Sequence, residues 1–177
     1  MKPMKLWLRW ACLAAWCAAS TTALAAPLLG EIDPDWREDE VPPPPAYSTS
    51  GLVDVDMPVG STVKVGLDPN TLMLNQKTGI VRYVVVMRGT AAVNASYEGI
   101  RCATGEWRIY ARQTEGNPWT DNEDDTWKPL SQRSGTIISY PVRLARDGLC
   151  MGSSLRFSAQ EMVRELRTGN SSLYRGL

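Results

Sequence analysis

The sequence predicts an α+β domain in which an antiparallel meander of about five strands carries helices packed on one face, with one disulfide. Three observations support this prediction. Residues 61–112 alternate apolar and polar side chains, the connections between the alternating stretches are too short for crossover helices, and the helix signals come only after the strands. We expect a single domain at 61–177, after a signal peptide at 1–25 and an acidic, proline-rich arm at 26–60.

The predicted strands are short stretches of period-two alternation with turn residues between them. They lie at 61–67, 71–74, 80–88, 92–101 and 106–112, with a shorter candidate at 127–130. The third stretch gives the strongest signal because it is rich in β-branched residues and alternates throughout. In the last long stretch, alternation places Arg108, Tyr110 and Arg112 on one face, as expected for a sheet that is solvated on one side.

Two helices are predicted after the strands. Pro141 suits the first turn of a helix that stops at Gly148. The second helix begins with a capping box in which Ser158 precedes Glu161 by three positions, and Gly169 ends it. Because the helices follow the strands instead of alternating with them, we expect them on one face of the sheet.

The first 25 residues have the three parts of an export signal. Lys2, Lys5 and Arg9 form a basic region, an apolar and small-residue stretch follows, and Ala23-Leu24-Ala25 is typical of a cleavage site. The apolar stretch is shorter than the roughly 20 residues that span a bilayer, so we expect a periplasmic protein without a transmembrane segment. Cleavage removes three basic residues and no acidic one, and the resulting acidic excess argues against a nucleic-acid binder.

Four cysteines divide into two pairs. Cys12 and Cys17 lie within the signal, whereas Cys102 and Cys150 remain in the exported chain. In an oxidising compartment we expect these two to form a disulfide. A redox pair or a thiol nucleophile is the alternative, but the chain lacks both the C-x-x-C spacing and a histidine that would activate a thiol.

The arm is acidic and carries four consecutive prolines at 42–45, which favour an extended polyproline helix. Within residues 31–56, eight acidic residues face only one basic residue, Arg37. Trp36 is the exception in this polar segment. A large aromatic side chain usually docks, so we expect it to anchor on the domain; stacking on a ligand is the alternative.

Four stretches of the chain form a distinctive set, at 68–72, 79–83, 92–102 and 107–111, and they are followed by Trp119 and Trp127. The run from Tyr97 to Cys102, Tyr-Glu-Gly-Ile-Arg-Cys, is the most specific part. Together these stretches resemble the cryptic neisserial protein-like family of exported proteobacterial proteins. The resemblance covers roughly residues 31–150 and implies a cell-envelope setting without a defined reaction. The sequence departs from the family where Arg112 follows the Tyr-Ala pair in place of glycine, and the helix after Cys150 lies outside the resemblance.

The chain contains no histidine, which excludes Ser-His-Asp and Cys-His mechanisms and the commonest zinc sites. The acidic loop has four carboxylates: Asp121, Glu123, Asp124 and Asp125. They could bind Ca²⁺, but the spacing lacks the glycine and final glutamate of an EF-hand, so a solvated loop and no metal site is the prediction. With Trp119 and Trp127 they could also form a sugar platform with a catalytic carboxylate pair. Burial of the two tryptophans against the sheet is the simpler interpretation.

A second candidate surface combines arginine, tyrosine and glutamate side chains on two neighbouring strands. Its members are Tyr97, Glu98, Arg101, Arg108, Tyr110 and Arg112. Glu98 is expected near one of the arginines as a cross-strand ion pair, which at a surface contributes at most about 1 kcal/mol. The alternative is a surface for an anionic ligand or partner, since arginine binds carboxylate and phosphate through two parallel hydrogen bonds.

These observations favour a non-enzymatic periplasmic module of the cell envelope that binds an envelope protein or a small anionic ligand, with no cofactor. The alternative is a hydrolase without histidine that acts on envelope polymer through carboxylates. A deep cleft with two convergent carboxylates would favour the enzyme, whereas a shallow surface of arginine and tyrosine would favour the binding module. A scaffold in a larger complex would be supported if Trp36 and the proline arm were detached from the domain.

Overall fold

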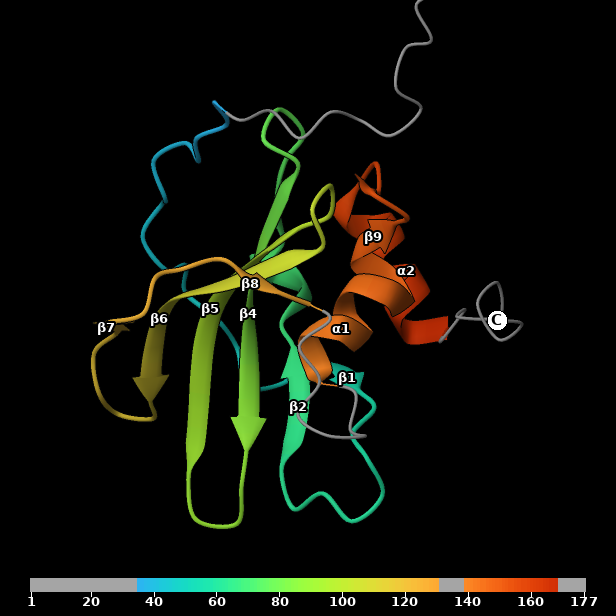
Figure 1. The fold of residues 1–177 in the computed structure, drawn as a ribbon. Helices are drawn as coiled ribbons and strands as arrows, with labels where there is room; N and C mark the ends of the chain where they lie inside the picture. Colours follow the sequence, from blue (N-terminus) through green and yellow to red (C-terminus); the bar gives the residue numbers. More distant parts are fainter. Residues whose placement is uncertain (1–34, 131–138, 169–177) are drawn as a thin grey trace, which may run out of the picture. The chain divides into compact units, whose positions relative to one another are not determined.

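The computed structural model describes residues 35–130 and 139–168, whose central element is an eight-stranded antiparallel sheet (Figure 1). The strands are β1 (Val53–Val55), β2 (Lys64–Leu67), β3 (Met73–Asn75), β4 (Ile80–Arg88), β5 (Val93–Arg101), β6 (Glu106–Thr114), β7 (Thr120–Asp121) and β8 (Lys128–Pro129). They follow the order β1-β2-β4-β5-β6-β7, with β3 also paired to β4 and β8 to β6. The antiparallel sheet is confirmed, but the prediction of about five strands is wrong because very short strands, such as β1 and β7, carry no resolvable alternation. The predicted signal peptide lies outside the described residues.

Alternation along β4 divides the sheet into two faces, because successive side chains in a strand point to opposite sides. Val81, Tyr83 and Val85 pack into one buried cluster and Val84 into another. Below, the "helix face" is the side of Tyr83, and the "arm face" is the side of Val84. All residues of β4 from Ile80 to Val86 are buried, so both faces are covered.

A β-bulge shifts the register between β5 and β6. Gly99 pairs with Arg108, whereas beyond the shift Ser96 pairs with Arg112. Tyr110 is the extra residue and keeps Arg108's side of the sheet, while Arg112 moves to the opposite side. The predicted common face for Arg108, Tyr110 and Arg112 is therefore wrong: the first two lie on the arm face and Arg112 on the helix face.

The helix face is covered by α1 (Tyr140–Leu144), the π-helical turn η2 (Ala145–Leu149) and α2 (Ala159–Thr168), with the small β9 (Cys150–Met151) and β10 (Ser154–Leu155) hairpin between them. Leu144, Leu149 and Met162 are fully buried in the same cluster as the β4 side chains. The predicted disulfide is confirmed, since Cys102 and Cys150 are bonded across 48 residues. This bond joins the end of β5 to the helical segment.

Both predicted helix starts are confirmed. Pro141 lies in the first turn of α1, although the α-helix gives way to the π-helical turn before Gly148. Ser158 Oγ accepts a hydrogen bond from the Glu161 amide at 3.2 Å, and the Glu161 carboxylate accepts one from the Phe157 amide at 3.2 Å. The predicted end of this helix, Gly169, lies outside the described residues. Among the residues described, no helix is long and apolar enough to cross a membrane.

Candidate functional site

An extended segment of the predicted arm covers part of the arm face. Residues 36–48, here called the docked arm, contain no helix or strand (Figure 1). Val41 and Tyr47 pack against the buried cluster of the arm face, and the Tyr47 ring meets Trp119 edge-on at 5.7 Å. At the end of the segment, the Ser48 amide donates to Asp68 Oδ2 at 2.7 Å. The arm is therefore attached to its own domain, contrary to what the scaffold interpretation required.

The docked arm places one carboxylate, that of Glu38, among three donors of the sheet. Glu38 Oε1 accepts from Arg82 Nη2 at 2.7 Å and from the Tyr110 hydroxyl at 2.6 Å, and Oε2 accepts from Arg108 Nη1 at 2.9 Å. Arg82, Arg108 and Tyr110 are called the cradle below. The side chains of Glu38 and Arg82 are 9% and 5% exposed, so this ion pair is largely removed from water.

The cradle is arranged by the register of the sheet. Arg82 on β4 and Arg108 on β6 both pair with Gly99 on the strand between them. Because Gly99 has no side chain, the Tyr110 ring can lie over it: a Cβ atom built there would be 2.5 Å from the Tyr110 hydroxyl. The guanidinium carbons of Arg82 and Arg108 lie 5.6 and 5.1 Å from the centre of this ring. Burial, followed by the hydrogen bond to Glu38, raises the pKa of Tyr110, so its hydroxyl remains a donor.

A second contact of the docked arm is made by Trp36. The Arg101 guanidinium carbon lies 3.7 Å from the centre of the Trp36 ring, a cation–π contact. Trp36 also meets Trp127 edge-on at 6.2 Å, and Trp127 in turn meets Tyr110 at 6.5 Å. The expected docking of Trp36 on the domain is confirmed, and its aromatic neighbours connect it to the cradle.

Several buried polar atoms around the docked arm have no hydrogen-bond partner among the described residues. They are the Nε1 atoms of Trp36 and Trp127, the Nε atoms of Arg82, Arg101 and Arg108, and the Tyr97 hydroxyl. Tyr97 is only 1% exposed, and burial raises its pKa to about 12, which keeps its proton in place. An unpaired buried donor costs about 1–3 kcal/mol, and the arm leaves this cost in place for these six atoms, although Glu38 satisfies the three donors of the cradle.

Glu98 lies on the opposite, helix face and is fully buried. Its carboxyl oxygens accept from the Tyr140 hydroxyl at 2.5 Å and from the Tyr83 hydroxyl at 3.4 Å. Burial raises the pKa of Glu98 to about 7, although the Tyr140 hydrogen bond and the charge of Arg112 oppose this rise. Within the described ranges Glu98 has no ion pair with an arginine, so the predicted cross-strand pair is not formed.

The acidic loop is held by local pairs. Lys128 Nζ lies 2.6 Å from Asp124 Oδ2, and this contact, together with Thr126, lowers the pKa of Asp124 to about 2. Asp125 Oδ2 accepts from Arg108 Nη2 at 3.1 Å and so joins the loop to the cradle. In residues 35–130 and 139–168, no group of three or more His, Cys, Asp or Glu side chains could hold a metal ion.

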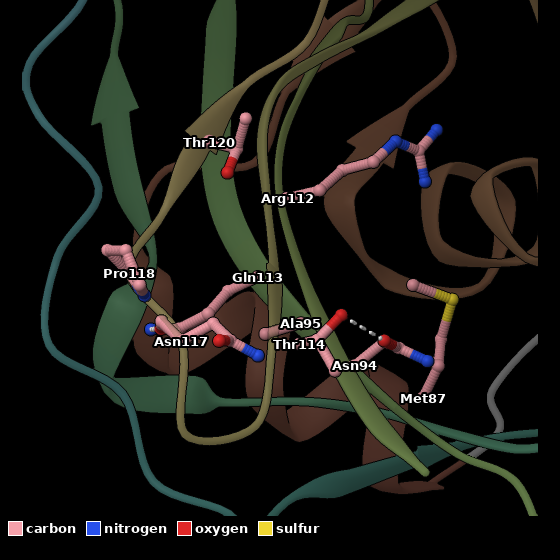
Figure 2. A pocket seen from close by; sticks show the side chains of 9 residues that line it. All are labelled: Met87, Asn94, Ala95, Arg112, Gln113, Thr114, Asn117, Pro118 and Thr120. Carbon is pink, nitrogen blue, oxygen red and sulfur yellow. Dashed lines mark hydrogen bonds between the residues drawn. The ribbon is translucent and has the colours of Figure 1, made fainter.

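Two hollows lie near β6. Figure 2 shows the first, of about 510 Å³, in which Thr114 Oγ1 donates to Asn94 Oδ1. The Gln113 side chain donates to the Asn117 carbonyl at 2.6 Å. The lining of this hollow combines neutral polar side chains with Arg112 and three apolar residues, Met87, Ala95 and Pro118, and contains no carboxylate. The second, of about 120 Å³, contains Asp124 as its one carboxylate. Neither has the convergent pair that carboxylate catalysis needs.

The structure separates the residues proposed from the sequence into three groups. Tyr97, Arg101, Arg108, Tyr110 and Trp127 gather around the docked arm. Glu98 and Arg112 lie on the other face, and Trp119 packs against Tyr47 at the far part of the arm. Sequence reasoning missed Arg82 and Glu38 as partners, because their contact spans 44 residues. The signal available was charge complementarity between an acidic arm and arginine-rich strands.

Comparison with known proteins identifies a family. No curated protein and no solved structure matches the chain significantly. The model of the CNP1-like family matches residues 31–167, which include the docked arm, the cradle and most of α2. The match extends beyond Cys150, where the sequence resemblance ended. The chain therefore belongs to the CNP1-like family.

Proposed function

We propose that this protein is a non-enzymatic binding module that recognises a carboxylate of a ligand or partner through Arg82, Arg108 and Tyr110. The observation that supports the proposal most directly is the convergence of three donors, from two strands, on a single carboxylate. Charge-assisted hydrogen bonds of this kind are roughly twice as strong as neutral ones, and their geometry selects a planar anion.

The immediate surroundings of the cradle support binding rather than catalysis. Tyr110 keeps its proton, both arginines are permanent cations, and the nearest loop carboxylate, Asp125, is already paired with Arg108. The site therefore supplies donors and positive charge, but no nucleophile or base among the residues that contact Glu38.

We further propose that the module acts in the periplasm. The basic, apolar and small-residue parts of the first 25 residues support export, and the Cys102–Cys150 bond suits an oxidising compartment. Mass spectrometry of the chain purified from periplasm should show the loss of about 25 residues. Recovery of the full-length chain with free thiols from the cytosol would contradict this location.

Chemical rescue tests the carboxylate site. In a Glu38→Ala variant the cradle lacks its carboxylate, and propionate at tens of millimolar should occupy it. Because a ligand that binds only the folded state stabilises it, the thermal midpoint of this variant should rise by a few degrees relative to chloride at the same ionic strength.

A paired variant controls for nonspecific salt effects. Glu38→Ala combined with Arg108→Ala should lose the response to propionate, while Glu38→Ala combined with Arg112→Ala, changed on the other face, should keep it. An equal response to propionate and chloride would refute the carboxylate site.

A further inference from the structure

We infer that the ligand of this site is an extended acidic peptide segment of another protein, with a tryptophan two residues before its carboxylate, and that the docked arm is an internal copy that this segment replaces. The inference rests on the proposed carboxylate site and specifies its ligand.

The first support is the way in which the arm is held. No backbone–backbone hydrogen bond joins residues 36–47 to the sheet in the part of the chain that the structure describes. The arm is attached through side chains, chiefly Trp36, Glu38 and Tyr47. A segment attached in this way separates from the sheet without disrupting a strand ladder, whereas removal of a paired strand would expose many backbone groups.

The second support is the spacing of the two residues that the face recognises. In an extended chain, residues two positions apart point to the same side. Trp36 and Glu38 accordingly both contact the sheet, while Arg37 between them is exposed. The surface thus recognises a Trp-x-Glu pattern. Arg101 and Trp127 contact the tryptophan ring, and the cradle binds the carboxylate.

The third support is the incomplete pairing beneath the arm. Among the residues that the structure describes, no acceptor lies within hydrogen-bond distance of the buried Tyr97 hydroxyl or of the buried Nε atoms of Arg82, Arg101 and Arg108. The arm excludes water from them but offers them no oxygen. A segment with further carboxylates or carbonyls within reach of these donors would bind the same face more completely than the arm does.

A tethered arm competes strongly with any free segment. A short flexible connection gives it an effective concentration in the millimolar range. Wild-type protein should therefore bind a simple copy of the arm only weakly, and weakening the arm should reveal the site.

The probe is a fluorescent peptide with the sequence of residues 35–47, and binding is followed by anisotropy. The full-length variant that combines Trp36→Ala with Glu38→Gln is here called the weakened-arm variant. We expect it to bind this peptide at least tenfold more tightly than wild-type protein. A peptide with glutamine at the position of Glu38 should bind this variant with at least tenfold lower affinity. The matched control is Glu40→Gln, an exposed arm position, which should behave as wild type.

Two substitutions locate the bound peptide. Arg108→Ala added to the weakened-arm variant should abolish peptide binding. Arg112→Ala added to the same variant should change the peptide affinity by less than twofold. Equal affinity in wild-type and weakened-arm proteins, or no saturable binding by a folded weakened-arm variant, would overturn the inference.

A measurement on wild-type protein covers the case in which the variant does not fold. In a ¹⁵N spectrum, millimolar unlabelled peptide should move the Trp36 indole signal toward its position in the free peptide. A signal that stays in place would also overturn the inference. If propionate rescues Glu38→Ala but the peptide fails these tests, the peptide ligand is wrong and the carboxylate site stands; if both fail, both proposals fall.

Discussion

Each face of the central sheet holds a glutamate that is largely removed from water, and the two differ in origin: Glu98 belongs to strand β5, whereas Glu38 belongs to the docked arm. On the helix face, Glu98 is surrounded by tyrosine hydroxyls beneath helices that share an apolar core and a disulfide with the sheet. On the arm face, Glu38 lies on a segment that makes no backbone hydrogen bond to the described part of the sheet, and its carboxylate contacts two arginines. The comparison teaches that one cover is part of the folding core, while the other is attached through a few side chains and suits exchange.

The largest expected loss of stability comes from removing the disulfide that links the sheet to the helical segment. Replacing Cys102 or Cys150 with serine removes a bond that closes 48 residues, and loop-closure entropy predicts a loss of about 4 kcal/mol in the free energy of unfolding. Thermal melts should show a midpoint lower by about 10 °C. The two single variants and the double variant should have the same thermal midpoint. A lower midpoint in the double variant would show that the two cysteine side chains contribute to stability independently of the bond between them.

The next effect concerns the arm face. Glu38→Ala leaves the buried Arg82 guanidinium without its carboxylate and removes one of the two carboxylates that contact the partly exposed Arg108, so it should cost about 3 kcal/mol in urea unfolding. In a double-mutant cycle with Arg108→Ala, the coupling energy should exceed about 1 kcal/mol. Glu40→Ala, its exposed neighbour in the arm, should change stability by less than about 0.5 kcal/mol. Equal losses for the two glutamates would mean that the cradle does not hold the arm.

A pH profile of stability tests the glutamate of the helix face, Glu98. Because the pKa of Glu98 is raised to about 7 from 4.5, folding favours its protonated form, so its contribution is full below about pH 4.5 and is lost as the pH rises through 7. Glu98→Gln cannot ionise. Between pH 5 and 8 the wild-type protein should therefore lose about 2 kcal/mol more stability than the variant. Parallel profiles for the two proteins would contradict an elevated pKa.

The smallest expected loss of stability comes from a substitution that displaces the Tyr110 ring of the cradle. In Gly99→Ala the new methyl group would lie 2.5 Å from the Tyr110 hydroxyl, so the ring must shift, at a cost of about 1–2 kcal/mol. The shift should also weaken propionate rescue when it is combined with Glu38→Ala. Gly89→Ala is the control, since its nearest contact is an ordinary 3.6 Å, and it should leave both properties unchanged.

The long strands and the helix starts were predictable because their signals are local. Ile80–Arg88 alternates throughout, and the Ser158 capping box depends on residues three apart, so neighbours in sequence determine both. The disulfide followed from elimination, since only Cys102 and Cys150 lie outside the predicted signal peptide. The short strands β1, β7, β9 and β10 were missed because two or three residues carry no periodicity.

The site was only partly predictable because it depends on register and on a distant segment. Arg108 and Tyr110 were identified, but the bulge opposite Tyr97 reverses the side of Arg112, and nothing in the alternating pattern of β6 indicates an extra residue. Glu38 was one of several acids in a segment that looked like a linker. Its role depends on contacts to residues 44 and 70 positions away, which no local pattern specifies.

The bond between Cys102 and Cys150 also determines what survives a broken backbone. Any single cut between these two positions, the acidic loop included, yields fragments that stay linked through sulfur. A protease that nicks the surface there therefore produces one molecule with an additional pair of ends, and the fragments separate on a gel only after a reductant is added.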